Sequence, residues 1–355
     1  MFHTALPRSV PRPAKLLATL AVAGAVLSGC QDNLAGLDTK AHVTVPKKLV
    51  SKMKAKNMDA NAPIMVRIFK QENTLEIWKK TRSGRYAMLA EYEICKWSGK
   101  LGPKFKEGDK QAPEGFYHVT PGLMNPRSKY HLAFNIGFPN AYDRSHGRTG
   151  THLMVHGACS SAGCYAMTDQ QVEVIYALAR DAFKGGQRSF QIQAFPFRMT
   201  EENMVQSRDS EHFPFWQMLK KGHDHFEITK VPPKVDVCEK RYEFNTQSSA
   251  RYISTQACPT RKMPRTTALA FAEYQSKSAT AFEELLAKAE RRDPVALAPL
   301  TLEQVLPGVT VEQPAPKPVP TAAPAAAPQQ AVRDPFLTNG TPTSELTAGS
   351  VATAD

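Results

Sequence analysis

The sequence lacks any apolar run of the ~20 residues that a membrane-spanning helix needs. Its N-terminal apolar segment, Leu16 to Leu27, has only 12 residues. Arg8, Arg12 and Lys15 precede this segment and form a basic region. A basic region followed by a short apolar one is the pattern of a secretory signal peptide. We therefore expect residues 1–30 to be an export signal rather than part of the fold.

The expected signal ends in Leu27-Ser28-Gly29-Cys30, which resembles the lipobox of bacterial lipoproteins. In such proteins the cysteine becomes the N-terminus and carries the acyl chains that hold the protein to a membrane. The alternative is a plain secretory signal in which Cys30 is incidental. Gln31, in place of Asp, favours the outer membrane of a Gram-negative cell. We expect a periplasmic protein that is lipid-anchored through Cys30.

The chain also lacks an even number of cysteines, if the lipobox cysteine is not counted. Five remain, so at least one thiol is free or pairs between molecules. Export would place them in an oxidising compartment, where disulfides persist. Cys238 and Cys258 lie close enough in sequence to close one loop. If Cys95 and Cys159 also pair, Cys164 is left reduced, although sequence alone does not fix the pairing.

Acidic residues are too few to balance the basic ones. Asp and Glu total 33 against 45 Lys and Arg, for a net charge of +12. A basic protein can bind nucleic acid, but an exported one seldom meets it, so we expect no nucleic-acid partner. Carboxylates on cell-wall stem peptides could attract a basic surface. A solvated basic face without a role explains the charge equally well.

Aromatic residues are scarce from Pro294 onward, where Pro and Ala dominate. Such a composition cannot support a packed core, which predicts a disordered tail over residues 294–355. The sequence shows no internal repeat. Before the tail we expect a linker with a short basic helix over residues 31–60, a main domain over 61–200 and a C-terminal extension over 201–293.

The main domain is predicted to be rich in strands. Short runs of apolar, β-branched and aromatic residues separated by turn signals predict strands over 64–69, 74–80, 86–95, 115–119, 130–135, 152–155 and 189–194. Thr168 and Gln171 form a capping box that begins a helix, and Gly185-Gly186 ends it. Further helices are predicted over 47–58, 215–221 and 267–292.

The chemically informative segment runs from Met154 to Met167. A predicted strand delivers His156, a loop of small residues follows, and Cys164 comes shortly before the helix. A cysteine attacks as its thiolate, so it needs a neighbouring base or cation. His156 is eight residues from Cys164 and could be that base. The alternative, a structural cysteine and histidine, remains open on the spacing alone.

The residues around His156 and Cys164 resemble the motif of a known family. His156-Gly157 followed by Ser161-Ala162-Gly163-Cys164 resembles the H-G…S-x-G-C signature of the L,D-transpeptidase (YkuD-like) family. Segment 112–117 also resembles the family, and the segments 97–104, 137–148 and 163–169 resemble its YafK-like branch in particular. The resemblance covers roughly residues 62–200 and makes the main domain the catalytic one.

The resemblance implies an α+β, mostly β fold, in which a mixed β-sandwich carries a helix beside the active-site loop. It also implies a peptidoglycan-modifying cysteine acyltransferase without cofactor or metal. Cys164 would attack a diaminopimelate carbonyl of a stem peptide after His156 takes its proton. The carbonyl of Gly157 would orient His156. The residues expected to form the oxyanion hole and to bind substrate are Ser161, Gly163 with Cys164, and Tyr165.

Two departures from the family pattern bear on the reaction. Many members have a His before the Gly-Cys pair and an Arg two residues after the Cys, whereas this chain has Ala162 and Ala166. The missing Arg removes a cation near the substrate, and the YafK-like branch shares this ending. Hydrolysis that releases a wall-linked outer-membrane lipoprotein is therefore an alternative to transfer. A non-catalytic wall-binding module is a third hypothesis.

Several other histidines have simpler explanations. His152 and His156 are four residues apart, but on one strand that spacing spans ~13 Å, too far for a shared metal ion. His223 and His225 are predicted to lie at a solvated helix end. The segment Tyr142 to Arg144 could line the groove or form a turn with a salt bridge.

Overall fold

The computed structural model describes residues 40–292 of the chain. All of them belong to a compact unit, Met1–Ala296, while a second unit, Leu297–Asp355, lies outside the described residues. The predicted signal peptide, the lipidation site at Cys30 and the predicted disordered tail also lie outside them. Within the described range, no helix has the length and apolar character needed to cross a membrane.

The larger sheet of the fold has five strands in the order β3-β2-β1-β10-β5. Only β1 and β10 pair in parallel, and the other neighbours are antiparallel. A parallel pair needs a long crossover, which here includes the second sheet and a helix. The strands are β1 (Ile64–Phe69), β2 (Thr74–Lys80), β3 (Tyr86–Glu93), β5 (Gly115–Val119) and β10 (Phe190–Phe195).

The second sheet carries the segment with His156 and Cys164. Its order is β4-β9-β8-β7-β6, and its central pair, β8 and β9, is parallel. These strands are short, and irregular segments border each of them. They are β4 (Lys96–Trp97), β6 (Met124–Asn125), β7 (Ala133–Asn135), β8 (Met154–His156) and β9 (Tyr165–Ala166).

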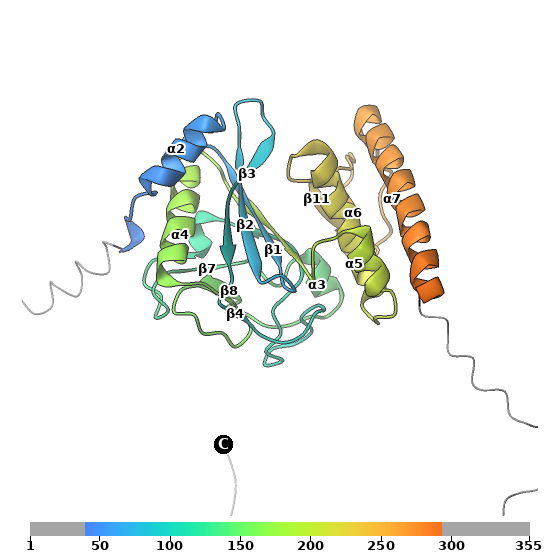
Figure 1. Cartoon of the computed structure of the whole chain (residues 1–355), viewed down its shortest axis with the longest axis horizontal. Helices are drawn as coiled ribbons and strands as arrows, with labels where there is room; N and C mark the ends of the chain where they lie inside the picture. Colours follow the sequence, from blue (N-terminus) through green and yellow to red (C-terminus); the bar gives the residue numbers. More distant parts are fainter. Residues whose placement is uncertain (1–39, 293–355) are drawn as a thin grey trace, which may run out of the picture. The chain divides into compact units, whose positions relative to one another are not determined.

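Helix α4 (Asp169–Lys184) follows β9 directly, as the capping box predicted. The Thr168 side chain accepts from the backbone N–H of Gln171, and the Gln171 side-chain oxygen accepts from the backbone N–H of Thr168. Apolar residues at helical spacing on α4 are buried in one core with both sheets. Helix α2 (Lys47–Ala55) packs beside the same core (Figure 1). The result is the expected α+β fold.

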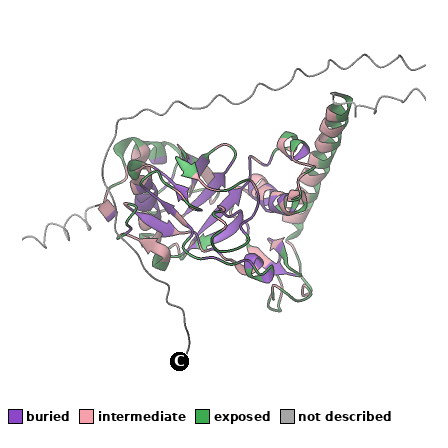
Figure 2. Ribbon diagram, turned by 90° about the horizontal axis from the view of Figure 1, so that it is seen from below, coloured by how far each residue is buried: buried purple, intermediate pink, exposed green. Residues whose placement is uncertain are grey.

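The other face of the larger sheet is covered by the chain after β10. A second core joins Phe69, Phe116 and Phe195 of the sheet to the helices that follow. Figure 1 shows these helices on the side of the sheet opposite α2 and α4, and Figure 2 shows that burial is concentrated in the strands. The elements are α5 (Glu201–Gln206), α6 (Phe213–Thr229), the hairpin β11 (Val235–Cys238) and β12 (Arg241–Phe244), and α7 (Arg265–Arg292).

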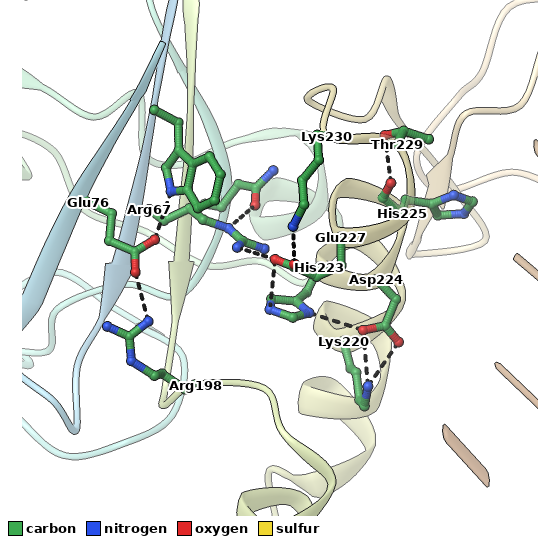
Figure 3. A network of polar contacts seen from close by, with 12 residues as sticks. Arg67, Glu76, Arg198, Lys220, His223, Asp224, His225, Glu227, Thr229 and Lys230 are labelled. Atoms are coloured by element: carbon green, nitrogen blue, oxygen red, sulfur yellow. Dashed lines mark hydrogen bonds and ion pairs between the residues drawn. The ribbon is translucent and has the colours of Figure 1, made fainter. Parts of the chain in front are cut away.

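A buried polar network joins α6 to the larger sheet (Figure 3). Arg67 of β1 forms an ion pair with Glu227 of α6 at 2.5 Å. Lys220 and His223 both bond Asp224, whose side chain has no exposed surface. Burial alone would raise the pKa of Glu227, but the Arg67 charge and the hydrogen bonds from Lys230 and Arg67 outweigh it and lower the pKa to about 2. The network therefore holds α6 in one orientation.

Three predicted elements need correction. The strand predicted over 130–135 is only β7, and the one over 152–155 begins at Met154, since His152 has a left-handed φ of 57°. The helix predicted over 215–221 extends through Thr229. His223 and His225 therefore lie inside α6 rather than at a solvated end, and His225 is 2% exposed.

The segment at 142–144 forms part of helix α3 (Ala141–Ser145). Asn140 caps this helix through its side chain, which accepts from the N–H of Asp143. Asp143 is buried and pairs with Arg148 at 2.9 Å. The segment is thus a helix with a salt bridge to Arg148 rather than the predicted turn, and none of its residues lines the cavity with Cys164.

Candidate active site

His156 and Cys164 are brought together by the parallel pairing of β8 and β9. In the register, Val155 lies opposite Tyr165 and His156 opposite Ala166. Extending that register by one residue places Cys164 opposite Met154, and the Met154 N–H indeed lies 3.4 Å from Cys164 Sγ. Residues two apart on a strand share a face. His156 and Cys164 therefore point to the same side of the sheet.

Both side chains line one cavity of ≈ 380 Å³. Its wall includes the loop between His156 and Cys164, the segment between β6 and β7, and residues of β6, β7 and β8. Besides His156 and Cys164, the lining residues are Asn125, Ser128, Lys129, Tyr130, Ala133, His152, Met154, Ser160, Ser161 and Ala162.

The imidazole of His156 is held in one tautomer. Its Nδ1 lies 2.6 Å from the carbonyl oxygen of Gly157, which can only accept, so Nδ1 carries the proton. The Tyr130 ring lies 4.8 Å from the imidazole, centroid to centroid. Burial lowers the pKa of His156, and the bond to Gly157 offsets this in part. At neutral pH Nε2 is thus an unprotonated acceptor.

A side chain at position 157 would not fit this turn without displacing its neighbours. A Cβ there would lie 2.5 Å from Oδ1 of Asp169 and 3.0 Å from Cβ of His131. The close approach also lets the Gly157 N–H donate to the Tyr130 carbonyl at 3.1 Å. The His-Gly pair of the motif thus fixes both the imidazole and the Tyr130 segment against it.

Cys164 is the free cysteine of the described chain. The other four form the disulfides Cys95–Cys159 and Cys238–Cys258, which is the pairing that leaves Cys164 reduced. Disulfide Cys95–Cys159 joins the loop after His156 to the chain between β3 and β4.

The Cys164 thiol is protonated at rest. Burial raises its pKa, while the Met154 N–H and the Lys104 charge act in the opposite direction without overcoming burial. Its Sγ lies 3.7 Å from the His152 carbonyl, which can accept the S–H. A neutral thiol and a neutral imidazole that line one cavity call for general-base deprotonation during attack rather than a preformed ion pair.

Lys104 forms an ion pair with Asp109, and a second, buried ion pair holds its loop. Lys70 Nζ contacts Glu114 Oε1 at 2.8 Å, and both side chains are fully buried. The same ammonium donates to the carbonyls of Gly102 and Ala112, at 3.1 and 3.0 Å. Lys70 and Glu114 therefore fix the loop that brings Lys104 towards the thiol.

The predicted oxyanion donors have a partner in this structure. The N–H groups of Cys164 and Gly163 lie 3.0 and 3.3 Å from Ser161 Oγ. Ser161 Oγ in turn donates to the Cys164 carbonyl at 2.6 Å. Gly163 adopts a φ of 128°, which a side chain would strain. A substrate oxygen that uses these donors must take the place of the Ser161 hydroxyl.

Tyr165 does not line the cavity, so its predicted contact with substrate through the side chain is wrong. It is fully buried in the core, and its hydroxyl donates to the Pro113 carbonyl at 2.6 Å. Strand alternation turns it to the face opposite Cys164. Ala166, where many family members have Arg, is also fully buried.

Sequence reasoning missed Tyr130 and Lys104. Neither belongs to the Cys–His motif, and only the pairing of distant segments brings them to the site. One group in the described chain has metal-ligand proximity: Cys238, Glu243 and Cys258. Its two cysteines are joined in a disulfide, so their sulfurs are not thiolate ligands.

Solved structures give only distant likenesses. The helical cell shape determining protein Pgp2 from Campylobacter jejuni is 19% identical over 53% of this chain and 78% of its own, with a TM-score of 0.29. Bd1075 from Bdellovibrio bacteriovorus is 22% identical over 47% of this chain and 58% of its own, with a TM-score of 0.27. TM-scores this low support no conclusion about this chain.

A curated relative is much more similar. No protein-family model matches the chain. However, it is 43% identical over 232 residues to the Escherichia coli (strain K12) protein named "Putative L,D-transpeptidase YafK", which covers 65% of this chain and 92% of that protein. The protein of the same name from Escherichia coli O157:H7 matches equally. The chain is therefore a member of the L,D-transpeptidase family, in its YafK-like branch.

Proposed function

We propose that the chain is a peptidoglycan-modifying cysteine enzyme with Cys164 as nucleophile and His156 as general base. The observation that carries this proposal is one cavity shared by a free thiol and an imidazole whose Nδ1 is tied to Gly157. A free cysteine and an oriented base in one cavity are the two groups that nucleophilic acyl transfer by cysteine requires. Membership of the L,D-transpeptidase family supplies the substrate class, the stem peptides of peptidoglycan.

The proposed reaction has two steps, acylation of Cys164 and transfer of the acyl group to an amine or water. His156 Nε2 takes the thiol proton while Sγ attacks the diaminopimelate carbonyl, and the N–H groups of Gly163 and Cys164 stabilise the oxyanion. The scissile C–N bond breaks, and the amine leaves with the proton from His156. An acceptor amine or water then attacks the thioester and passes a proton to His156. The C–S bond breaks, and His156 returns the proton to the departing Cys164 sulfur.

Hydrolysis is the second candidate, favoured by the environment of Ala166. This residue pairs with His156, is fully buried, and places a methyl group where many relatives have an arginine. Without that cation, an acceptor carboxylate has less to hold it near the thioester, and water competes better. We propose release of a wall-linked outer-membrane lipoprotein as this alternative, in a periplasmic, lipid-anchored enzyme.

The test is product analysis by mass spectrometry. The chain is incubated with tetrapeptide muropeptides and, separately, with lipoprotein-linked muropeptides. A crosslinked dimer indicates transfer, loss of a terminal D-Ala indicates carboxypeptidation, and lipoprotein released through its lysine indicates hydrolysis. Absence of every such product would overturn the proposal.

The matched variants assign each product to the site. Cys164→Ala should lower turnover by about 10⁴-fold or more, because the nucleophile is gone. His156→Gln keeps a similar side-chain volume and should cost nearly as much. Lys184→Gln, at an exposed position on α4, serves as the control and should leave turnover unchanged.

A further inference from the structure

A second cavity, of ≈ 510 Å³, shares no lining residue with the one that contains Cys164. It lies between helix α3, helix α6 and the turn of the β11–β12 hairpin. The catalytic proposal uses none of its residues.

The interior of this cavity is apolar and aromatic. Tyr142 of α3 and Met218 of α6 are 5% and 8% exposed. The rings of Tyr142 and Phe215 stack with centroids 5.6 Å apart and an interplanar angle of 18°. Tyr142 also stacks on Tyr242, with centroids 4.4 Å apart, so Tyr142 packs beneath Phe215, which is half-buried and can contact an aliphatic stem.

Three exposed cations lie around this aromatic surface. Lys221 comes from α6, and Lys240 and Arg241 come from the hairpin. Within residues 40–292 none of the three forms an ion pair, and no Asp or Glu lines the cavity. The positive field in the cavity is therefore uncompensated, which favours an anionic ligand.

The backbone that carries these cations is anchored. Pocket residues Met218 and Lys221 share one face of α6, while the network of Figure 3 binds another face to the sheet. The Cys238–Cys258 disulfide fixes the hairpin end, and the Lys240 N–H bonds the Ser254 carbonyl at 2.7 Å. A preformed site loses less entropy on binding.

We propose that this cavity binds a carboxylate-bearing glycopeptide segment of peptidoglycan. Phe215 contacts its aliphatic part, and Lys221, Lys240 and Arg241 pair with its carboxylates. This inference rests on the proposed function for the identity of the ligand. It makes the cavity a second contact with the wall, separate from the amide that Cys164 attacks.

The test measures retention of the full chain on purified peptidoglycan. All chains carry Cys164→Ala, so that no turnover alters the matrix. Lys221→Glu with Arg241→Glu should weaken retention by about tenfold, since two charge-assisted contacts become repulsive. Lys80→Glu with Lys184→Glu makes the same change in net charge at exposed sites outside the cavity and should weaken retention by about twofold at most.

Amidation of the peptidoglycan carboxylates should bring retention of the reference chain down to that of the cavity variant. Equal losses in the cavity and control variants would overturn the proposal, because they would indicate general charge attraction. Unchanged retention of the cavity variant would overturn it as well. With Cys164 intact, the cavity variant should still process a short soluble muropeptide; no product from the unaltered chain would refute the proposed function instead.

Discussion

The protonation states of two side chains decide how the candidate site works. A buried imidazole with a lowered pKa and a buried thiol with a raised pKa are both neutral near pH 7. The family motif predicted the pair itself, Cys164 and His156, because the two residues are close in sequence. It could not predict the supporting contacts from Tyr130 and Lys104, which depend on the packing of segments far apart in the chain.

The first prediction concerns the pH dependence of kcat/KM. His156 must be unprotonated to accept the thiol proton, and burial lowers its pKa from 6.5. Activity should therefore fall with acid only at a pH below 6.5, and this limb should vanish in His156→Gln. An acid limb centred above 6.5 would contradict a His156 pKa that burial lowers.

The second prediction concerns Lys104, the cation that acts on the thiol. Lys104→Met should raise the pKa of Cys164 further, because a charge that favours the thiolate is removed. The pH dependence of alkylation by iodoacetamide measures this change. Lys100→Met, on an exposed neighbour in the same loop, is the control. The same alkylation curve for both variants would contradict the role given to Lys104.

Among the elements, strands with strong local patterns were predictable and short ones were not. The bounds predicted for β1, β2 and β5 agree with the structure, since apolar and β-branched residues mark them. Strands β4, β6 and β9 have two residues each, and pairing with distant segments defines them. The β11–β12 turn has positive φ at Glu239 and Lys240, and no Gly or Asn signals it.

Disulfide Cys95–Cys159 is the element-scale constraint on the site. It closes a separation of 64 residues and holds the loop that follows His156. Replacing both cysteines by Ala should lower the free energy of unfolding by about 4 kcal/mol and also reduce kcat. Urea unfolding and turnover of a muropeptide measure the two effects. Lost stability with unchanged kcat would mean that the disulfide has no part in positioning the site.

Stability of the described unit should depend on acid through buried histidines. Burial lowers the pKa of His225 to about 4, and its Nδ1 has no hydrogen-bond partner. The unfolded chain takes up a proton near pH 6.5 and the folded one only near 4, so stability is lost as pH falls between these values. The loss is about 3 kcal/mol.

His225→Phe should remove this part of the acid dependence, because a phenyl ring keeps the stacking on Phe271 without a titrating group. In the unaltered chain the His225 and Phe271 ring centroids lie 4.0 Å apart. Urea midpoints at pH 7 and pH 4 measure it. Parallel losses of stability in the unaltered chain and the variant would contradict the assignment.

For the molecule as a whole, we expect Cys164 to form a thioester with a stem peptide. The direct measurement is the intact mass of the chain, quenched with acid shortly after mixing with a tetrapeptide muropeptide, followed by peptide mapping. A single adduct of the donor acyl mass on the peptide that contains Cys164, absent in Cys164→Ala, is the predicted result. Product formation with no adduct at any time, or with an adduct on another residue, would contradict it.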